Sequence, residues 1–277
     1  MGPVTSLWSD LGRPPLSERA LRAALVRPGG FVREVHVVAE TGSTNADLAE
    51  VARRGGPEGV VLVAEAQTGG RGRLDRTWTS PPRAGLLFSV LLRPQLPPPR
   101  RTWIPLLAGL AVQQAVSRLG AVETRLKWPN DLLLGDDLGK AGGILAQATG
   151  DAVVVGVGLN VTTRRAELPE GAVSLLTEGA GCTDRDPLLR AILRTLADRY
   201  AEWSAEWSAG PDRLRPAYEA VCDTIGQDVR VQLPDGSALA GTATGLDEMG
   251  RLVVRTTDGD VQVSAGDVTR VRPVTVR

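Results

Sequence analysis

Residues 67–78 read Gln-Thr-Gly-Gly-Arg-Gly-Arg-Leu-Asp-Arg-Thr-Trp and directly follow the stretch 60–66, which is apolar except for Glu65. The apolar run predicts a buried strand that leads into a loop. Glycine lets backbone amides approach a ligand closely, and the guanidinium groups of Arg71, Arg73 and Arg76 supply forked, permanently charged donors. This composition favours the wrapping of a phosphate or a carboxylate. A disordered basic loop that touches nucleic acid, or nothing, is the alternative interpretation.

The composition excludes several classes of protein. The chain has 277 residues, and its 32 basic residues balance 32 acidic ones, so no global field attracts nucleic acid or anionic lipid. Two cysteines without CxxC spacing, Cys182 and Cys222, argue against a disulfide framework and favour the cytoplasm. The single histidine, His36, excludes multi-histidine metal sites and argues against a histidine general base. The N-terminus shows no secretion signal, and no apolar run approaches the roughly 18 residues that a membrane span requires.

Hydrophobic periodicity predicts mixed α and β structure up to residue 225. Thr44 and Asp47 resemble a capping box at the start of one helix, and Gly55 is expected to end it. Helices are expected at 21–25, 44–52, 103–119 and 188–207, and strands at 31–38, 60–66, 85–92, 123–127, 130–134, 141–148 and 152–159.

The pattern changes after Gly226 to short strands separated by turn signals. These signals are Pro234-Asp235-Gly236, Met249-Gly250 and Asp258-Gly259, at roughly even spacing. Such spacing is typical of a small β-barrel. We therefore expect two domains, residues 1–225 and 226–277.

Two polar segments have both a functional and a purely structural interpretation. Ser43-Thr44-Asn45 follows Gly42 at a predicted helix N-terminus, where its side chains either cap the helix or grip a polar ligand. In the stretch 127–131, Lys-Trp-Pro-Asn-Asp, the final Asp131 follows a rigid X-Pro kink and is well placed to hold Mg²⁺. A simple Pro-Asn-Asp turn is the alternative.

Two glycine-rich segments resemble nucleotide-binding motifs only superficially. Gly139-Lys140-Ala141 lacks the spacing and the Ser or Thr of a P-loop, although a lysine beside Gly142 and Gly143 suits close approach to an anion. Gly156-Val157-Gly158-Leu159-Asn160 fails as a dinucleotide fingerprint because Val161 stands where a small residue belongs. We interpret its glycines as backbone clearance for a bound nucleotide or cofactor.

The order and combination of these motifs resemble the biotin–protein ligase family over about residues 31–161. The short barrel-like tail matches the C-terminal domain of that family in position and size. The patterns GRGRxxRxW and KWPND are highly specific. In chain order the motifs are Ser43-Thr44-Asn45, Gln67…Gly70-Arg71-Gly72-Arg73…Arg76…Trp78, Lys127-Trp128-Pro129-Asn130-Asp131, Lys140-x-Gly142-Gly143-Ile144-Leu145 and Gly156-x-Gly158-x-Asn160.

The resemblance implies an α+β fold, with a mixed β-sheet flanked by helices as in class II synthetases and lipoate ligases, and an SH3-like C-terminal barrel. It implies that ATP and Mg²⁺ activate biotin to biotinyl-AMP. The biotinyl group then passes to one lysine of the biotin carboxyl carrier domain of acetyl-CoA or acyl-CoA carboxylase, or of a related carboxylase.

The resemblance also implies residue roles. The carboxylate and the α-phosphate repel each other, and the charges of Arg71, Arg73, Lys140 and a metal on Asp131 would offset that repulsion. Asp131 is also a candidate to accept the proton of the carrier lysine. The biotin-contacting residues would be Ser43, Thr44, Asn45 and Gln67, and the closing loop would contain Arg71, Gly72, Arg73, Arg76 and Trp78. The nucleotide, metal and carboxylate end would involve Asn130, Asp131, Lys140, Gly142, Gly143, Gly156, Gly158 and Asn160.

Two further expectations and two rival interpretations complete the comparison with this family. Only 42 residues precede Ser43, too few for the three-helix DNA-binding domain of some relatives, so no DNA binding is expected. A monomer or a weak homodimer is expected. The rival interpretations are a lipoate ligase or octanoyltransferase, and an RNA-binding module with strongly salt-dependent affinity.

Overall fold

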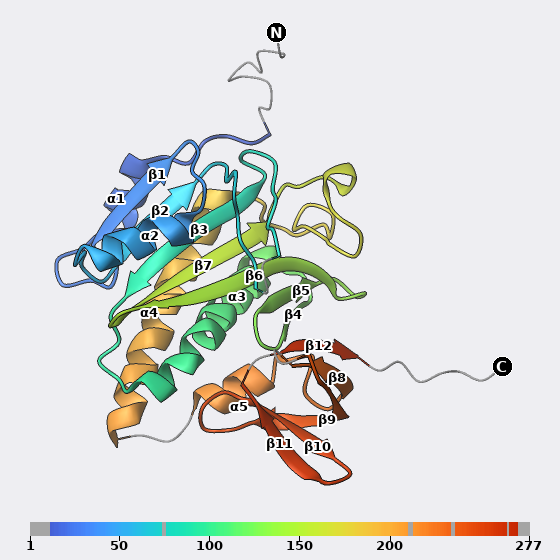
Figure 1. The fold of residues 1–277 in the computed structure, drawn as a ribbon. Helices are drawn as coiled ribbons and strands as arrows, with labels where there is room; N and C mark the ends of the chain where they lie inside the picture. The colour runs from blue at the N-terminus through green and yellow to red at the C-terminus, as the bar shows by residue number, and fades with distance from the viewer. Residues whose placement is uncertain (1–11, 74–75, 210–212, 234–235, 265, 271–277) are drawn as a thin grey trace.

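The computed structural model describes residues 12–73, 76–209, 213–233, 236–264 and 266–270 (Figure 1). Its main feature is a seven-stranded mixed sheet with the order β1-β2-β3-β7-β6-β5-β4. The first two strands of this order are parallel, and all other neighbours are antiparallel. The strands are β1 (Glu34–Val38), β2 (Val60–Ala64), β3 (Gly85–Leu92), β4 (Thr124–Lys127), β5 (Asp131–Leu134), β6 (Gly139–Thr149) and β7 (Ala152–Asn160).

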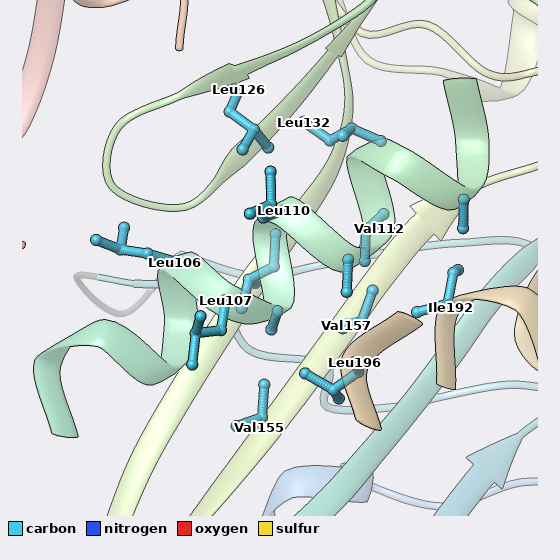
Figure 2. Packing of buried hydrophobic residues seen from close by; sticks show 14 of the residues in the cluster. Leu106, Leu107, Leu110, Val112, Leu126, Leu132, Val155, Val157, Ile192 and Leu196 are labelled. Atoms are coloured by element: carbon cyan, nitrogen blue, oxygen red, sulfur yellow. The ribbon is translucent and has the colours of Figure 1, made fainter. Parts of the chain in front are cut away.

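Two long helices, α3 (Ile104–Gly120) and α4 (Arg185–Ala209), cover one face of this sheet (Figure 1). Figure 2 shows Leu110 of α3, Ile192 of α4 and Val157 of β7 in the same apolar layer. This layer is the main hydrophobic core, because alternate side chains of each strand point into it. The short helix α1 (Glu18–Leu25) packs against β1 and α4.

The opposite face of the sheet is covered by α2 (Thr44–Arg53), which buries a smaller apolar cluster. The cluster includes Leu48 of α2, Leu91 of β3 and Val154 of β7. By strand alternation Ser89 and Gly156, which are register partners, lie on this same face. On this face the apolar cluster therefore ends near the N-terminus of α2, where a serine and a glycine replace apolar side chains.

The C-terminal part forms a second, antiparallel sheet with the order β11-β10-β9-β8-β12. It is joined to the main core by indole hydrogen bonds: Trp128 donates to the carbonyl of Gly250 at 3.1 Å, and Trp103 donates to that of Glu248 at 2.9 Å. Its strands are β8 (Asp228–Gln232), β9 (Ala238–Leu246), β10 (Leu252–Thr256), β11 (Gly259–Val263) and β12 (Asp267–Arg270).

The predicted fold class, a mixed sheet flanked by helices with a small C-terminal β-domain, is confirmed. Predicted strand ends fall within a few residues of the observed ones, and no described helix is long and apolar enough to cross a membrane. Part of the predicted turn at 234–236, and the segment that would carry a secretion signal, lie outside the described residues. The short helices η1 (Pro98–Trp103), η2 (Arg165–Glu167) and α5 (Leu214–Glu219) were not predicted.

The predicted capping box at Thr44 is wrong, because Ser43 is the residue that caps α2. The Ser43 side chain accepts from the backbone of Ala46 at 3.5 Å. Asp47 instead accepts a hydrogen bond from the hydroxyl of Thr41 at 2.5 Å. Thr44 points elsewhere, since its hydroxyl contacts Gln67 in the cavity described below.

Replacement of Phe88 by alanine should destabilise the protein by about 3–5 kcal/mol, because a large side chain that is 1% exposed leaves a cavity in the main core. Urea denaturation followed by circular dichroism measures this change. Leu176→Ala is the control, since Leu176 is 46% exposed and its truncation should cost less than about 0.5 kcal/mol. Equal midpoints for the two variants would contradict the assignment of the core.

Candidate functional site

A cavity of about 470 Å³ lies on the α2 face of the large sheet. The loop after β2, the ends of β5, β6 and β7, and the start of the C-terminal strand β12 contribute to its walls. Among the predicted site residues only Gly142 is not part of the lining; a Cβ atom there would lie 2.9 Å from the carbonyl oxygen of Gly158 and 3.4 Å from Cβ of Leu132, a residue of the main core. The predicted residues that line it are Ser43, Thr44, Asn45, Gln67, Arg71, Gly72, Arg73, Arg76, Trp78, Asn130, Asp131, Lys140, Gly143, Gly156, Gly158 and Asn160.

One end of the cavity is a network of uncharged hydrogen-bonding groups. The backbone amide and the hydroxyl of Thr44 both donate to the side-chain oxygen of Gln67, at 2.8 and 3.1 Å. The Asn45 amide donates to the carbonyl of Leu145 at 3.0 Å. Since Thr44 and Asn45 are buried and their side chains are engaged, this end of the cavity is preorganised.

Ser89 supports this network, and sequence reasoning missed it. Its hydroxyl oxygen lies 2.7 Å from Oγ1 of Thr44 and 2.6 Å from Oδ1 of Asn45, and the residue is fully buried. Ser89 is the one polar residue in the apolar strand Gly85–Leu92. A buried hydroxyl requires a partner, so this interruption of the apolar pattern was the available signal.

The glycines of β6 and β7 leave space for side chains of the protein itself. A Cβ atom at Gly158 would lie 2.7 Å from the indole of Trp78, and one at Gly156 would lie 2.1 Å from Oδ1 of Asn45. Gly143 faces the same indole, with its Cβ position 3.7 Å from Cζ3. A side chain at Gly156 or Gly158 would thus meet Asn45 or Trp78, and both glycines also line the cavity, so their role beside a bound ligand stays a prediction.

Trp78 is held in place by the loop that carries it. Its backbone amide donates to Gly70 at 2.9 Å, and Arg71 and Thr77 form an isolated antiparallel bridge. The indole Nε1 is buried and has no hydrogen-bond partner in the described part of the chain. Leu74 and Asp75 lie outside the described residues.

The other end of the cavity contains the charged groups. The ammonium of Lys140 lies 2.7 Å from Oδ1 of Asp131, whose side chain is 18% exposed. Arg73 donates to Oδ1 of Asn130 at 3.2 Å and to the carbonyl of Gly266 at 3.4 Å. Burial lowers the pKa of the Arg73 guanidinium, while the charges of nearby Asp131 and Asp267 raise it. An additional anion at this end would therefore be attracted to groups that are already partly desolvated.

The remaining predicted residues differ in how they are held. Asn160 is buried in the lining and donates to the carbonyl of Val173 at 3.0 Å. Arg76 forms an ion pair with Asp267 of the C-terminal sheet. The side chain of Arg71 is exposed and has no ion-pair or hydrogen-bond partner among the described residues.

Two walls of the cavity were not predicted. One is the segment 163–172, which reaches Lys140 through backbone bonds from the Lys140 amide to Gly171 at 3.2 Å and from the Val173 amide to the Lys140 carbonyl at 2.9 Å. The other is Gly266-Asp267 of the C-terminal sheet. Neither segment has a chemical signature in the sequence, because only long-range packing brings it to the site.

The described residues include no group of three or more His, Cys, Asp or Glu side chains placed to hold a metal. Asp131 is a cavity-lining carboxylate beside Lys140. Mg²⁺ is commonly bound through one or two carboxylates together with substrate phosphates and water. Asp131 therefore fits a metal that arrives with a phosphate-bearing ligand, and not an ion held by the protein alone.

Comparison with known proteins identifies the family. The profile of the Biotin/lipoate A/B protein ligase family matches residues 40–161, and that of the Biotin protein ligase C terminal domain matches residues 224–270. A biotin–[acetyl-CoA-carboxylase] ligase of Mycobacterium tuberculosis is 45% identical over 95% of this chain and 98% of its own length. The chain belongs to the biotin–protein ligase family.

Other members of the family are similar over shorter stretches or in structure. The bifunctional ligase/repressor BirA of Escherichia coli is 32% identical over 71% of this chain and 61% of its own length. The biotin protein ligase of Aquifex aeolicus in complex with biotin and ATP superposes with a TM-score of 0.74, at 28% identity, over 86% of this chain and all of that chain. The Leishmania major ligase in complex with biotinyl-5-AMP superposes with a TM-score of 0.58, at 26% identity, over 84% of this chain and 99% of that chain.

Gly158→Ala should destabilise the protein by about 1–3 kcal/mol, because the new methyl group would displace the Trp78 indole. In a Trp78→Ala background the same change should cost about 1 kcal/mol less, since the obstructing ring is gone. A double-mutant cycle measured by chemical denaturation tests this. Gly181→Ala is the control, because its nearest neighbour would lie 3.6 Å from the new Cβ. A cycle with no coupling energy would show that the packing of the Trp78 indole does not require glycine at position 158.

Proposed function

We propose that this chain is an ATP-dependent ligase that activates biotin to biotinyl-AMP and transfers the biotinyl group to a lysine of a biotin carboxyl carrier domain. One observation carries the proposal: a single cavity joins an uncharged hydrogen-bonding end at Thr44 and Gln67 to a cationic end at Arg73 and Lys140. Biotin has the matching distribution, with a neutral ureido head and a carboxylate tail. Membership of the family supports the same assignment.

The uncharged end is assigned to the ring system of biotin. Neutral donors and acceptors there match a urea group, whose carbonyl accepts and whose two N–H groups donate. The Trp78 indole, lying against Gly158 and Gly143, supplies the apolar wall for the thioether ring and the alkyl chain. Ser43 and Asn45 belong to the same end of the cavity and are assigned to biotin recognition.

The first step joins two anions. The biotin carboxylate attacks the α-phosphorus of ATP, a P–O bond forms, and the bond to the β-phosphate oxygen breaks to release pyrophosphate. Repulsion between the two groups is severe in a desolvated cavity, and Arg71, Arg73 and Lys140 offset it with fixed positive charge. The carboxylate is itself the nucleophile, so no histidine or cysteine is required.

Asn130, Asp131 and Asn160 are assigned to the nucleotide end, and Asp131 is proposed to hold Mg²⁺ with the phosphates. When bound, the metal neutralises the negative charge of the phosphate oxygens. Lys140 lies beside Asp131, so the two residues present one positive and one negative group to the reacting centre. Gly143 lies beside this pair, since its Cβ position is 4.0 Å from Oδ1 of Asp131.

In the second step the amine of the carrier lysine attacks the acyl carbon of biotinyl-AMP, an amide bond forms, and AMP leaves. The attacking amine must lose a proton, and Asp131 is proposed to accept it, since it is the carboxylate next to the proposed acyl position. The proposed partners are the carrier domains of acetyl-CoA or acyl-CoA carboxylase and of related carboxylases. The cytoplasm, which contains these carboxylases, is the proposed location.

The decisive test is incubation with biotin, MgATP and a carrier domain, followed by intact-mass measurement of the carrier. We expect the mass to increase by one biotinyl group on one lysine, with pyrophosphate released in equal amount. Lipoate in place of biotin should give neither product. A carrier modified with lipoate and not with biotin would assign the chain to the lipoate branch of the matched family.

Lys140→Ala should reduce biotin-dependent pyrophosphate release by about a hundredfold or more, because it removes a preorganised cation from the reacting centre. The melting temperature should change little, since the Lys140 side chain is 39% exposed. Arg19→Ala, a surface change away from the cavity, is the matched control. Undiminished pyrophosphate release from the folded Lys140 variant would refute its assigned role.

Arg73→Gly should let biotinyl-AMP escape before transfer. Arg73 ties the loop to Asn130 and to Gly266 of the C-terminal sheet, and its loss should leave the closed loop without those contacts. We expect biotin to appear on lysines of a bystander protein such as albumin, detected by mass spectrometry. Equal labelling of the bystander by the variant and the wild type would argue against loop closure.

A further inference from the structure

The segment before α1, residues 12–17, contacts structures on two sides of the cavity, and we call it the N-terminal strap. The backbone amide of Leu16 donates to Glu65 at 2.6 Å. Glu65 is 7% exposed and forms an ion pair with Arg185 at 2.6 Å, and Arg185 also donates to the carbonyl of Pro14 at 2.6 Å. Glu65 stands two residues before Gln67, which lines the uncharged end of the cavity.

The strap reaches the opposite side of the cavity through Arg13. Its guanidinium lies 2.5 Å from Oε2 and 3.2 Å from Oε1 of Glu167, and it donates to the carbonyl of Thr162 at 2.8 Å. Arg13 is 7% exposed and the Glu167 side chain is 27% exposed, so the guanidinium is shielded from water while the carboxylate stays partly open to it. Two charge-assisted hydrogen bonds on one carboxylate fix its orientation as well as its position. The Arg13 guanidinium also lowers the pKa of Glu167, which keeps that carboxylate ionised.

Glu167 belongs to the wall 163–172, which is fastened to Lys140. The Lys140 amide donates to Gly171, and the Lys140 carbonyl accepts from Val173, so the wall and the strand that carries the ammonium share backbone bonds. Arg13 therefore holds a segment that is also bonded, through Gly171 and Val173, to Lys140, the cation assigned to the reacting centre.

We propose that Arg13 is a positioning residue for ligation: by holding Glu167, it sets the wall 163–172 and the Lys140 backbone at the nucleotide end of the cavity. This inference rests on the proposed function. It concerns the ATP end and not the biotin end, because the contacts of Thr44 with Gln67 do not involve Arg13 or Glu167.

The test measures biotin-dependent release of pyrophosphate with ATP and biotin varied separately. Arg13→Ala should raise the KM for ATP by about five- to tenfold and leave the KM for biotin unchanged. Glu167→Gln, which keeps the shape and removes the charge, should act in the same direction. Arg13→Lys keeps the positive charge but not the two parallel donors of the guanidinium, so its KM for ATP should lie between those of the wild type and Arg13→Ala. The double variant should be no worse than the more affected single one, because both act through one contact.

Arg54→Ala is the matched control, because Arg54 also pairs with a glutamate, Glu50, but on the exposed surface of α2. It should change neither KM. An unchanged KM for ATP in folded Arg13→Ala and Glu167→Gln, with an active wild type, would overturn the inference and leave the proposed function standing. If Arg13→Ala does not fold, Glu167→Gln alone decides in the same way. An inactive wild type would overturn both proposals.

Discussion

Close contact between side chains and bare backbone shapes the cavity. At Gly156 and Gly158 a methyl group would collide with Asn45 and Trp78, so these two positions on β7 must be glycine for the amide and the indole to lie against the sheet. The same face of the sheet buries apolar side chains under α2 a few residues earlier. Strand β7 therefore contributes both to the apolar cluster under α2 and to the wall of the cavity. Its glycines lie where the cluster ends and the cavity begins.

The charged side chains of the site are constrained by the cost of removing charge from water. Arg73, Lys140 and Asp131 are partly buried, and each is paired or hydrogen-bonded within the cavity, which limits the cost of removing them from water. Cations held in this way need little reorganisation when an anion arrives. The C-terminal sheet takes part, since Gly266 accepts from Arg73 and Asp267 pairs with Arg76. The C-terminal sheet, which has no chemical motif of its own, thus helps to position Arg73 and Arg76.

Much of the fold was predictable because local patterns encode it. The apolar run that became β2 and the glycine that follows α2 are read from neighbouring residues alone. The cap of α2 was misassigned, because Ser43 and Thr44 are equivalent as local signals and only the distant Gln67 distinguishes them. The short helix α5 was missed, since six residues provide too little periodicity for recognition.

By itself the sequence determined which residue types are available for the proposed chemistry, and where along the chain the strands that carry them lie. Motifs and periodicity are local properties of the chain, so both can be read without the fold. Only the tertiary structure decided which groups meet. Asn45 bonds to Leu145 across 100 positions, and Arg13 bonds to Glu167 across 154. Such contacts depend on how strands pair and how helices pack, and a local sequence pattern specifies neither. The wall at 163–172 and the strap at 12–17 therefore became visible only in the folded chain, whereas Ser89 interrupts an apolar strand in the sequence and only its partners required the structure.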